Sequence, residues 1–179
     1  MSAPAVLFLD IDGVLNRTKS ATHIRLDDDL VERLRKLVAA IECKIVLSTF
    51  WRPFLPYIQY ILHRHGLPTD CVIGSTPGAS GEPGISNPSN FANGSTQSAG
   101  GSSNQQLFTA SAFDDAQYVS RAAEIGAWLD AHPEVARYVV LDDRPSAADA
   151  RLAPRFVQTA SDAGLTEEDA ERCKLLLLS

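Results

Sequence analysis

Two pairs of carboxylates end apolar runs of this sequence and could do chemistry together. Asp10 and Asp12 stand two residues apart in AVLFLDIDGVLN, and Asp142 and Asp143 end RYVVLDD. Four acids in one place would repel each other by several kcal/mol at an effective dielectric constant of about 20. A divalent cation would remove this repulsion, and oxygen ligands favour Mg²⁺ over Zn²⁺.

The elements that must position these acids are apolar runs that alternate with helical patterns. The apolar runs predict buried strands at residues 5–10, 44–48, 71–74, 137–143 and 155–159. The amphipathic patterns predict helices at residues 27–42, 53–65, about 119–131 and about 166–176. This alternation predicts an α/β fold, a Rossmann-like doubly wound three-layer sandwich with a central parallel sheet. Thr166 and Asp169 have the spacing of a capping box at the start of the last helix.

The carboxyl ends of the strands are where such sheets gather their reactive groups. Ser48 and Thr49 follow the second predicted strand, and the helix before the fourth strand begins near Arg121. One edge of the sheet would therefore collect up to four carboxylates, two hydroxyls and a cation.

Four motifs resemble those of the haloacid dehalogenase (HAD) superfamily. LFLDIDGVLN is similar to the first motif, KIVLSTFWR to the second and YVVLDDRP to the fourth. Arg121, which lies 21 residues before Asp142, stands where the third motif has a cation, more often Lys. The motifs LSTFWR, RAAEIGAWL and VVLDDR are also similar to small HAD domains of multi-domain RNA repair proteins.

The resemblance implies a Mg²⁺-dependent phosphatase that works through an aspartyl-phosphate. Asp10 would be the nucleophile, and Asp12 the general acid and then the base for water. Residues i and i+2 of an extended segment point to the same side, so both could reach one phosphoryl group. The resemblance also implies that Asp10, Asp142 and the backbone carbonyl of Asp12 hold the metal. Asp143 would be a further ligand or a partner that orients one.

Five further residues receive roles. Thr49 would hydrogen-bond a phosphoryl oxygen, with Ser48 as the alternative if the strand ends one residue earlier. Arg121 would neutralise charge on the nucleophile and the phosphoryl group. Gly13 lets the backbone turn away without a Cβ clash, next to the bound substrate. Arg52 could contact substrate or form a salt bridge.

Several other polar and aromatic residues could have either a functional or a purely structural role. Arg17, Lys19, His23 and Arg25 could form a basic rim that steers an anionic substrate, or a solvated loop. Arg144 could contact substrate or form a salt bridge. The larger aromatic residues are predicted to pack rather than to stack on nucleic acid bases: Trp51, Trp128, Tyr57 and Tyr60.

The length of 179 residues fits a single domain, residues 1–179, with a low-complexity insertion at about residues 74–112. Residues 74–106 are almost all Gly, Ser, Asn, Pro, Thr and Gln, which predicts a flexible surface segment. A lid over the site is the alternative. The resemblance places cap domains in this insertion or after the first motif, and neither has room for a large one. We therefore expect an open site.

The net charge and the cysteines limit which binding partners and which cellular compartment are expected. A net charge of −6 argues against tight, sequence-independent binding to duplex nucleic acid. No apolar run approaches the ~20 residues that cross a bilayer, so no membrane partner is expected. Cys43, Cys71 and Cys173 are scattered and fit buried thiols in a reducing compartment. These features favour an intracellular, cytoplasmic protein.

The most direct function is hydrolysis of a phosphomonoester, and an open site fits a macromolecular substrate. Two alternatives remain. One is a polynucleotide-end phosphatase in nucleic-acid repair, which the basic residues after Asp12 favour and the net charge does not. The other is a metal- or phosphate-binding module with weak catalysis, against which the presence of the Asp12 side chain argues.

Overall fold

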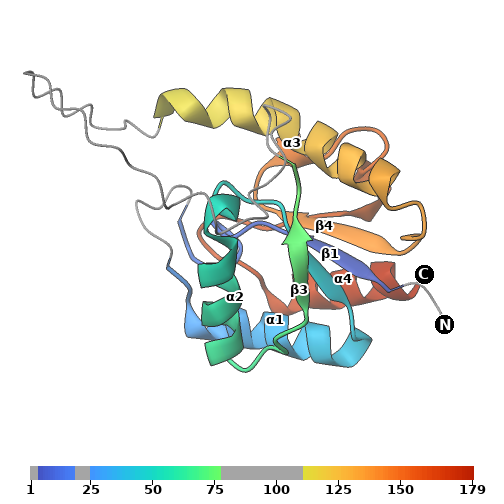
Figure 1. Cartoon of the computed structure of the whole chain (residues 1–179). Helices are drawn as coiled ribbons and strands as arrows, with labels where there is room; N and C mark the ends of the chain where they lie inside the picture. Colours follow the sequence, from blue (N-terminus) through green and yellow to red (C-terminus); the bar gives the residue numbers. More distant parts are fainter. Residues whose placement is uncertain (1–3, 19–24, 78–110) are drawn as a thin grey trace, which may run out of the picture.

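Five apolar runs form the strands of one parallel sheet (Figure 1). The computed structural model describes residues 4–18, 25–77 and 111–179, and of residues 111–120 the backbone alone. The strands lie in the order β3-β2-β1-β4-β5. Their bounds are β1 (Val6–Leu9), β2 (Lys44–Leu47), β3 (Val72–Ser75), β4 (Tyr138–Asp142) and β5 (Phe156–Gln158). The predicted parallel sheet is therefore confirmed.

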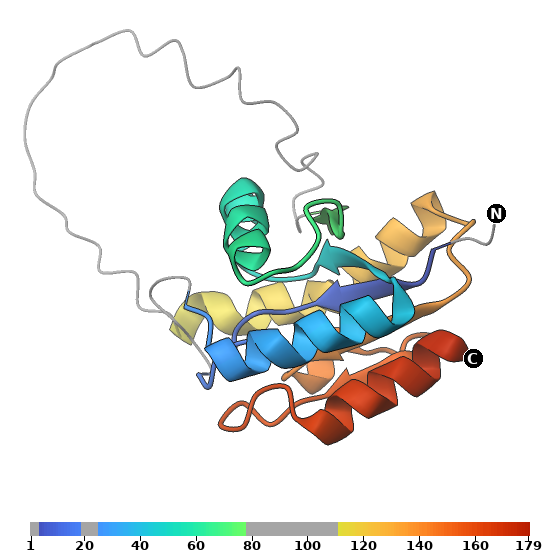
Figure 2. The same ribbon diagram turned by 90° about the horizontal axis from the view of Figure 1, so that it is seen from below.

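Helices cover both faces of this sheet. The four α-helices are α1 (Asp28–Ile41), α2 (Leu55–Arg64), α3 (Ser111–Ala131) and α4 (Glu167–Leu178). Short 3₁₀ turns occupy Arg52–Phe54, Pro145–Ala147 and Ala153–Arg155. Buried residues of α1, α2 and α4 share one core with the sheet, whereas those of α3 belong to the other core. Figure 2 shows α1 and α4 side by side below the sheet, with α3 on its far side.

Alternation along the strands explains the two cores. In β1, Leu7 and Leu9 belong to the core beneath α1 and α4, while Val6 and Phe8 belong to the core beneath α3. The Trp128 ring of α3 meets Phe8 edge to face, with the ring centroids 5.3 Å apart. Successive side chains of a strand point to opposite faces, so a strand covered on both sides must be apolar throughout.

Two predicted boundaries were wrong, and both lie at the ends of the proposed insertion. β3 continues one residue further than predicted, to Ser75, and α3 begins at Ser111 instead of near residue 119. Backbone pairing does not require apolar side chains, and parallel pairing of Gly74 and Ser75 with β2 extends the strand. The apolar residues that revealed the helix are those that pack on the sheet. The remainder of the insertion, including any lid, lies outside the described residues.

Local signals elsewhere were reliable. The Thr166 hydroxyl accepts a hydrogen bond from the Asp169 backbone amide, and the Asp169 carboxylate accepts one from the Thr166 backbone amide. These two bonds confirm the capping box. The three cysteines are buried and unpaired, as expected, and burial raises the pKa of Cys43 to about 11. In the described part of the chain, no helix combines the length and apolar character that crossing a membrane requires.

Candidate active site

The carboxyl edge of β1 and β4 carries the predicted acids. Leu9 and Leu141 are paired across these two neighbouring strands, and Asp10 and Asp142 are the next residues of each. The chain winds from β1 to β2 and β3 on one side and then returns to place β4 on the other. Ligands of open α/β sheets bind outside the carboxyl ends of the strands at such a switch point.

Three carboxylates meet at this edge, and we call Asp10, Asp142 and Asp143 the acidic cluster. One oxygen from each lies within 4.8 Å of the other two. The residues are only 2 %, 1 % and 6 % exposed, respectively. Charged groups buried this deeply require compensation by a partner.

Arg121 provides part of that compensation from the middle of α3. Its Nη1 lies 3.2 Å from Asp10 Oδ1 and 3.1 Å from Asp142 Oδ2, and it also donates to the backbone carbonyl of Ser48. The expectation that the helix begins near Arg121 was wrong, because α3 starts ten residues earlier. Arg144 also lies at ion-pair distance from Asp143, so three carboxylates face two guanidinium groups, and a bound cation would offset the remaining negative charge.

The pKa shifts in the acidic cluster also indicate that its charges need a compensating cation. Burial, followed by repulsion from Asp10, raises the pKa of Asp142 well above its usual range, despite the opposing effect of Arg121. Burial also raises the pKa of Asp143, although the hydrogen bond from Ser161 acts in the opposite direction. A bound cation would favour the ionised form of both carboxyl groups.

Two oxygens of the cluster have the chemistry of metal ligands. Within the described residues, Asp10 Oδ2 and Asp143 Oδ1 are buried and accept no hydrogen bond. Arg144 Nε lies 3.7 Å from Asp143 Oδ1, which is an ion-pair distance. Buried oxygens without a donor are rare, and hard cations such as Mg²⁺ bind carboxylate oxygens. The residues present therefore fit a divalent metal.

Asp12 lies apart from the cluster and is held by two neutral donors. Asn16 Nδ2 donates to Asp12 Oδ1 at 2.8 Å, and the Trp51 indole Nε1 donates to Asp12 Oδ2 at 3.0 Å. The segment after β1 turns here instead of continuing as a strand, and Asn16 also accepts from the Gly13 amide. These contacts fix the orientation of the Asp12 carboxyl group.

The two hydroxyls after β2 are both buried but differ in their contacts. Ser48 is 1 % exposed, and in the described structure its Oγ has no hydrogen-bond partner. Thr49 is fully buried, and its Oγ1 accepts from the Trp51 amide at 3.3 Å. The Ser48 carbonyl is also the one that Arg121 contacts. Ser48 is thus linked to the acidic cluster through Arg121.

Gly13 permits a close approach between the first and fourth motifs. Its φ of +73° is in the left-handed region, and a Cβ there would lie 2.5 Å from Asp143 Oδ2. The Gly13 carbonyl accepts from the Thr159 hydroxyl at 2.7 Å, which ties the turn to the end of β5. A residue with a side chain at position 13 would displace Asp143.

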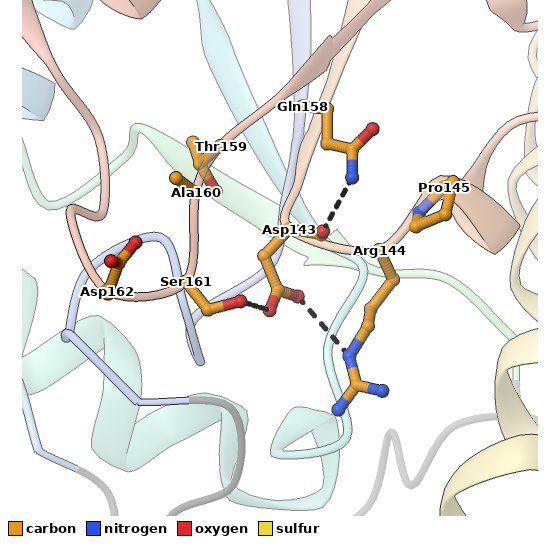
Figure 3. Close-up of a pocket in the computed structure, with 8 residues that line it drawn as sticks. All are labelled: Asp143, Arg144, Pro145, Gln158, Thr159, Ala160, Ser161 and Asp162. Atoms are coloured by element: carbon orange, nitrogen blue, oxygen red, sulfur yellow. Dashed lines mark hydrogen bonds and ion pairs between the residues drawn. The ribbon is translucent and has the colours of Figure 1, made fainter.

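A pocket of about 550 Å³ borders the acidic cluster on the side of β5 (Figure 3). Asp143 lines it, and the hydroxyl of Ser161 donates to Asp143 Oδ2 at 2.8 Å. Gln158 Nε2 donates to the Asp143 carbonyl at 3.1 Å from the other side. Figure 3 shows the carboxylate of Asp143 between the side chains of Ser161 and Arg144. Asp143 is therefore positioned by the last residue of β5 and by the loop that follows it.

The other predicted cations have protein partners. Arg52 Nη1 and Nη2 each lie 3.2 Å from an oxygen of Glu124, a buried residue of α3. Arg17 pairs with Asp27 and Asp29, and Arg25 lies 3.5 Å from Asp27. Lys19 and His23 of the predicted basic rim lie outside the described residues. Arg17 and Arg25 are thus parts of an ion-pair network at the start of α1.

The prediction that the larger aromatics pack was right for Trp128 and wrong for two tyrosines. Trp128 is 8 % exposed, whereas Tyr57 and Tyr60 on α2 are 51 % and 58 % exposed. Trp51 is partly buried against the core and touches Asp12 as well. A periodic pattern of apolar residues predicts a helix, but it does not show which aromatic rings on that helix are buried against the sheet.

Several site residues were missed by sequence reasoning. Thr159 and Ser161 follow β5, so the rule of strand ends, if applied to the fifth strand, would have found them. Asn16 and Trp51 contact Asp12 through turns whose geometry no local pattern fixes. Glu124 lies one helical turn after Arg121, on the buried side of α3.

Comparison with known protein families identifies the family of the chain. Residues 6–170 match the model of a family described as "HAD domain in Swiss Army Knife RNA repair proteins". The match covers most of the chain, and the chain therefore belongs to this family of the HAD superfamily. Searches of curated proteins and of solved structures gave no match.

Proposed function

We propose that the protein is a Mg²⁺-dependent phosphohydrolase that cleaves a phosphomonoester through an aspartyl-phosphate on Asp10. The observation that carries this proposal is the state of the Asp10 carboxylate. Its Oδ1 is held by Arg121, while its Oδ2 is buried beside the acidic cluster and, in the described structure, accepts no hydrogen bond. A carboxylate oxygen held in this way is suited to attack phosphorus.

The proposed reaction has two displacements at phosphorus. First, one oxygen of the Asp10 carboxylate forms a bond to phosphorus as the bond to the leaving oxygen breaks, and Asp12 gives the leaving oxygen a proton. Then Asp12 takes a proton from a water whose oxygen attacks the same phosphorus, which releases phosphate and restores Asp10. Hydrogen bonds from Asn16 and Trp51 orient Asp12, and a second lone pair on either carboxyl oxygen can carry the proton.

The surrounding residues supply charge and position. Arg121 would hold Asp10 Oδ1 and reduce the negative charge at the site, while Ser48 or Thr49 would donate to a phosphoryl oxygen. Mg²⁺, held by Asp10, Asp142 and the Asp12 carbonyl with Asp143 beside them, would neutralise charge on the phosphoryl group. Gly13 keeps the space between the two acidic strand ends free of a side chain. Phosphoryl transfer depends mainly on such positioning and charge neutralisation.

The test compares the release of phosphate from an aryl phosphate by the wild type and by Asp10→Asn, with and without Mg²⁺. We expect the substitution to lower kcat by at least ~10³-fold, because it removes the nucleophile. Asp28→Asn is a matched control, since this α1 side chain is 92 % exposed. Equal Mg²⁺-dependent rates in wild type and Asp10→Asn would show that the nucleophile is misassigned. Activity absent from both would favour a binding module.

A second candidate is the narrower activity of a polynucleotide-end phosphatase. The family description, which refers to RNA repair proteins, favours it. A panel of oligonucleotides with a terminal phosphate, phosphopeptides and sugar phosphates would separate it from a general phosphatase. A preference of less than about tenfold for the oligonucleotides, or about 1.4 kcal/mol, would argue against this narrower activity.

A further inference from the structure

Exposed aromatic rings gather on one segment beside the candidate site. In the described residues, seven large hydrophobic side chains are exposed, and four of them lie between residues 50 and 60. These four, Phe50, Phe54, Tyr57 and Tyr60, are 50 % to 58 % exposed. We call residues 50–60 the aromatic segment. Its rings lie on the turn after β2 and on the first turns of α2.

The aromatic segment begins at the candidate general acid. Trp51 donates its indole hydrogen to Asp12 Oδ2 at 3.0 Å. The ring of Phe50 meets Trp51 edge to face at 6.1 Å, and Phe54 is tilted against it at 6.0 Å. A substrate with its phosphate at Asp10 therefore has its next chemical groups within reach of these rings.

The charge of the same stretch favours a polyanion. Residues 43–69 contain no Asp or Glu, although the whole chain has a net charge of −6. The charged side chains of the aromatic segment and of α2 are those of Arg52 and Arg64. Arg52 forms an ion pair with Glu124. Thr76, which follows β3, donates a hydrogen bond to the same Glu124 carboxylate. A phosphodiester chain that leaves the acidic cluster along this stretch would meet no carboxylate belonging to it.

We propose that the aromatic segment stacks the bases of a single-stranded polynucleotide whose phosphorylated end enters the site at Asp10. This inference rests on the proposed phosphatase function and names its substrate class. Aromatic rings bind unpaired bases without regard to sequence, and each stacked base contributes about 1–3 kcal/mol. Phe50 and Phe54, the exposed rings in contact with Trp51, take the bases nearest the phosphate.

The main experiment compares the wild type with the double variant Phe50→Ala/Phe54→Ala. The substrates are a short single-stranded oligoribonucleotide with a terminal phosphate and a sugar phosphate that has no aromatic group. The ratio of kcat/KM for the oligonucleotide to that for the sugar phosphate should fall at least about tenfold in the double variant. Phe50→Trp/Phe54→Trp should retain the ratio, because it restores the flat rings.

Leu175→Ala provides the matched control. Leu175 is 67 % exposed on α4, which packs mainly against α1, β4 and β5. Its substitution removes exposed apolar surface and should leave the ratio unchanged. Thermal melting of each variant would establish that all of them are folded.

A binding measurement keeps this inference separate from the phosphatase assignment. Fluorescence anisotropy of a labelled oligonucleotide with the Asp10→Asn protein does not require turnover. Binding that weakens at least about tenfold when Phe50→Ala/Phe54→Ala is added would support the stacking surface even if no phosphate is released. An unchanged affinity, no binding of the oligonucleotide, or tighter binding of a phosphotyrosine peptide would overturn it. Oligonucleotides with ribose or deoxyribose would show whether the 2′-hydroxyl contributes.

Discussion

The side chains of the acidic cluster are at most 6 % exposed, whereas the four outer rings of the aromatic segment are at least half exposed. Trp51 of the aromatic segment donates a hydrogen bond to Asp12, two residues after Asp10 of the acidic cluster. The acidic cluster concentrates charge where water is excluded, which strengthens electrostatic interactions at a cost in stability. The aromatic segment leaves apolar surface in water, which is a cost that binding would recover.

This difference shows that different structural elements at one edge of a sheet can carry different roles. The acidic cluster comes from the ends of β1 and β4, which the sheet holds rigidly on both sides. The aromatic segment comes from a short 3₁₀ turn and a helix at the side of β3. Groups that must be placed accurately sit on strands, and groups that contact a variable ligand sit outside them.

The largest effect should come from loss of a metal ligand in the acidic cluster. We expect Asp142→Asn to lower phosphatase activity by about 10³-fold, because metal neutralisation of a phosphoryl group supplies several kcal/mol. Thermal melting with and without Mg²⁺ should show that the metal no longer stabilises the variant. Asp70→Asn, at a side chain that is 76 % exposed, is the control and should behave as the wild type. If Mg²⁺ still stabilised the Asp142→Asn variant, the metal site would have to lie elsewhere in the protein.

Gly13→Ala tests how tightly the acidic cluster is packed. The new Cβ would fall 2.5 Å from Asp143 Oδ2 and would hold φ in the left-handed region, so the variant should lose about 2–4 kcal/mol of unfolding free energy. Denaturant unfolding measures this loss. Gly74→Ala is the matched control, since a Cβ there has no atom within 4 Å. Similar losses in both variants would mean that the packing of Asp143 is not the cause.

The pH dependence of Mg²⁺ binding tests the electrostatics of the same cluster. Because the pKa of Asp142 is raised in the folded protein, the metal-free native state retains a proton that the unfolded chain has lost. Its stability should therefore fall as the pH rises above the unfolded pKa and through the folded one. Mg²⁺ competes with that proton, so stabilisation by Mg²⁺ should increase as the pH rises through the folded pKa of Asp142. Melting curves over this range measure the difference, and equal stabilisation would contradict it.

The smallest effect is expected in the aromatic segment. Tyr57→Ala should change the unfolding free energy by no more than about 0.5 kcal/mol, because the ring is 51 % exposed. Trp128→Ala, in which an 8 % exposed ring is removed from the core beneath α3, should cost about 3–5 kcal/mol. Denaturant unfolding of both variants would test the contrast. A large loss in Tyr57→Ala would make this ring structural and would remove it from the proposed binding surface.

The sequence was sufficient for most of the fold because apolar runs and turns are local signals. The five strands, the four helices and the capping box at Thr166 were all predicted within a few residues, except for the start of α3. The first ten residues of that helix are preceded by a low-complexity stretch, and the apolar residues that reveal the helix begin later. The candidate site was partly predictable for the same reason, since a residue directly after a parallel strand must lie at the sheet edge.

The sequence alone predicts that Asp10 and Asp142 stand at the ends of two buried strands, because short apolar runs form strands when they can be covered on both faces. The packing of the folded chain makes the two strands neighbours, brings Arg121 of α3 between their acids and places Trp51 against Asp12. It also decided that the aromatic segment stays exposed. These features depend on how helices dock against the sheet, which joins residues far apart in the chain and leaves no local pattern.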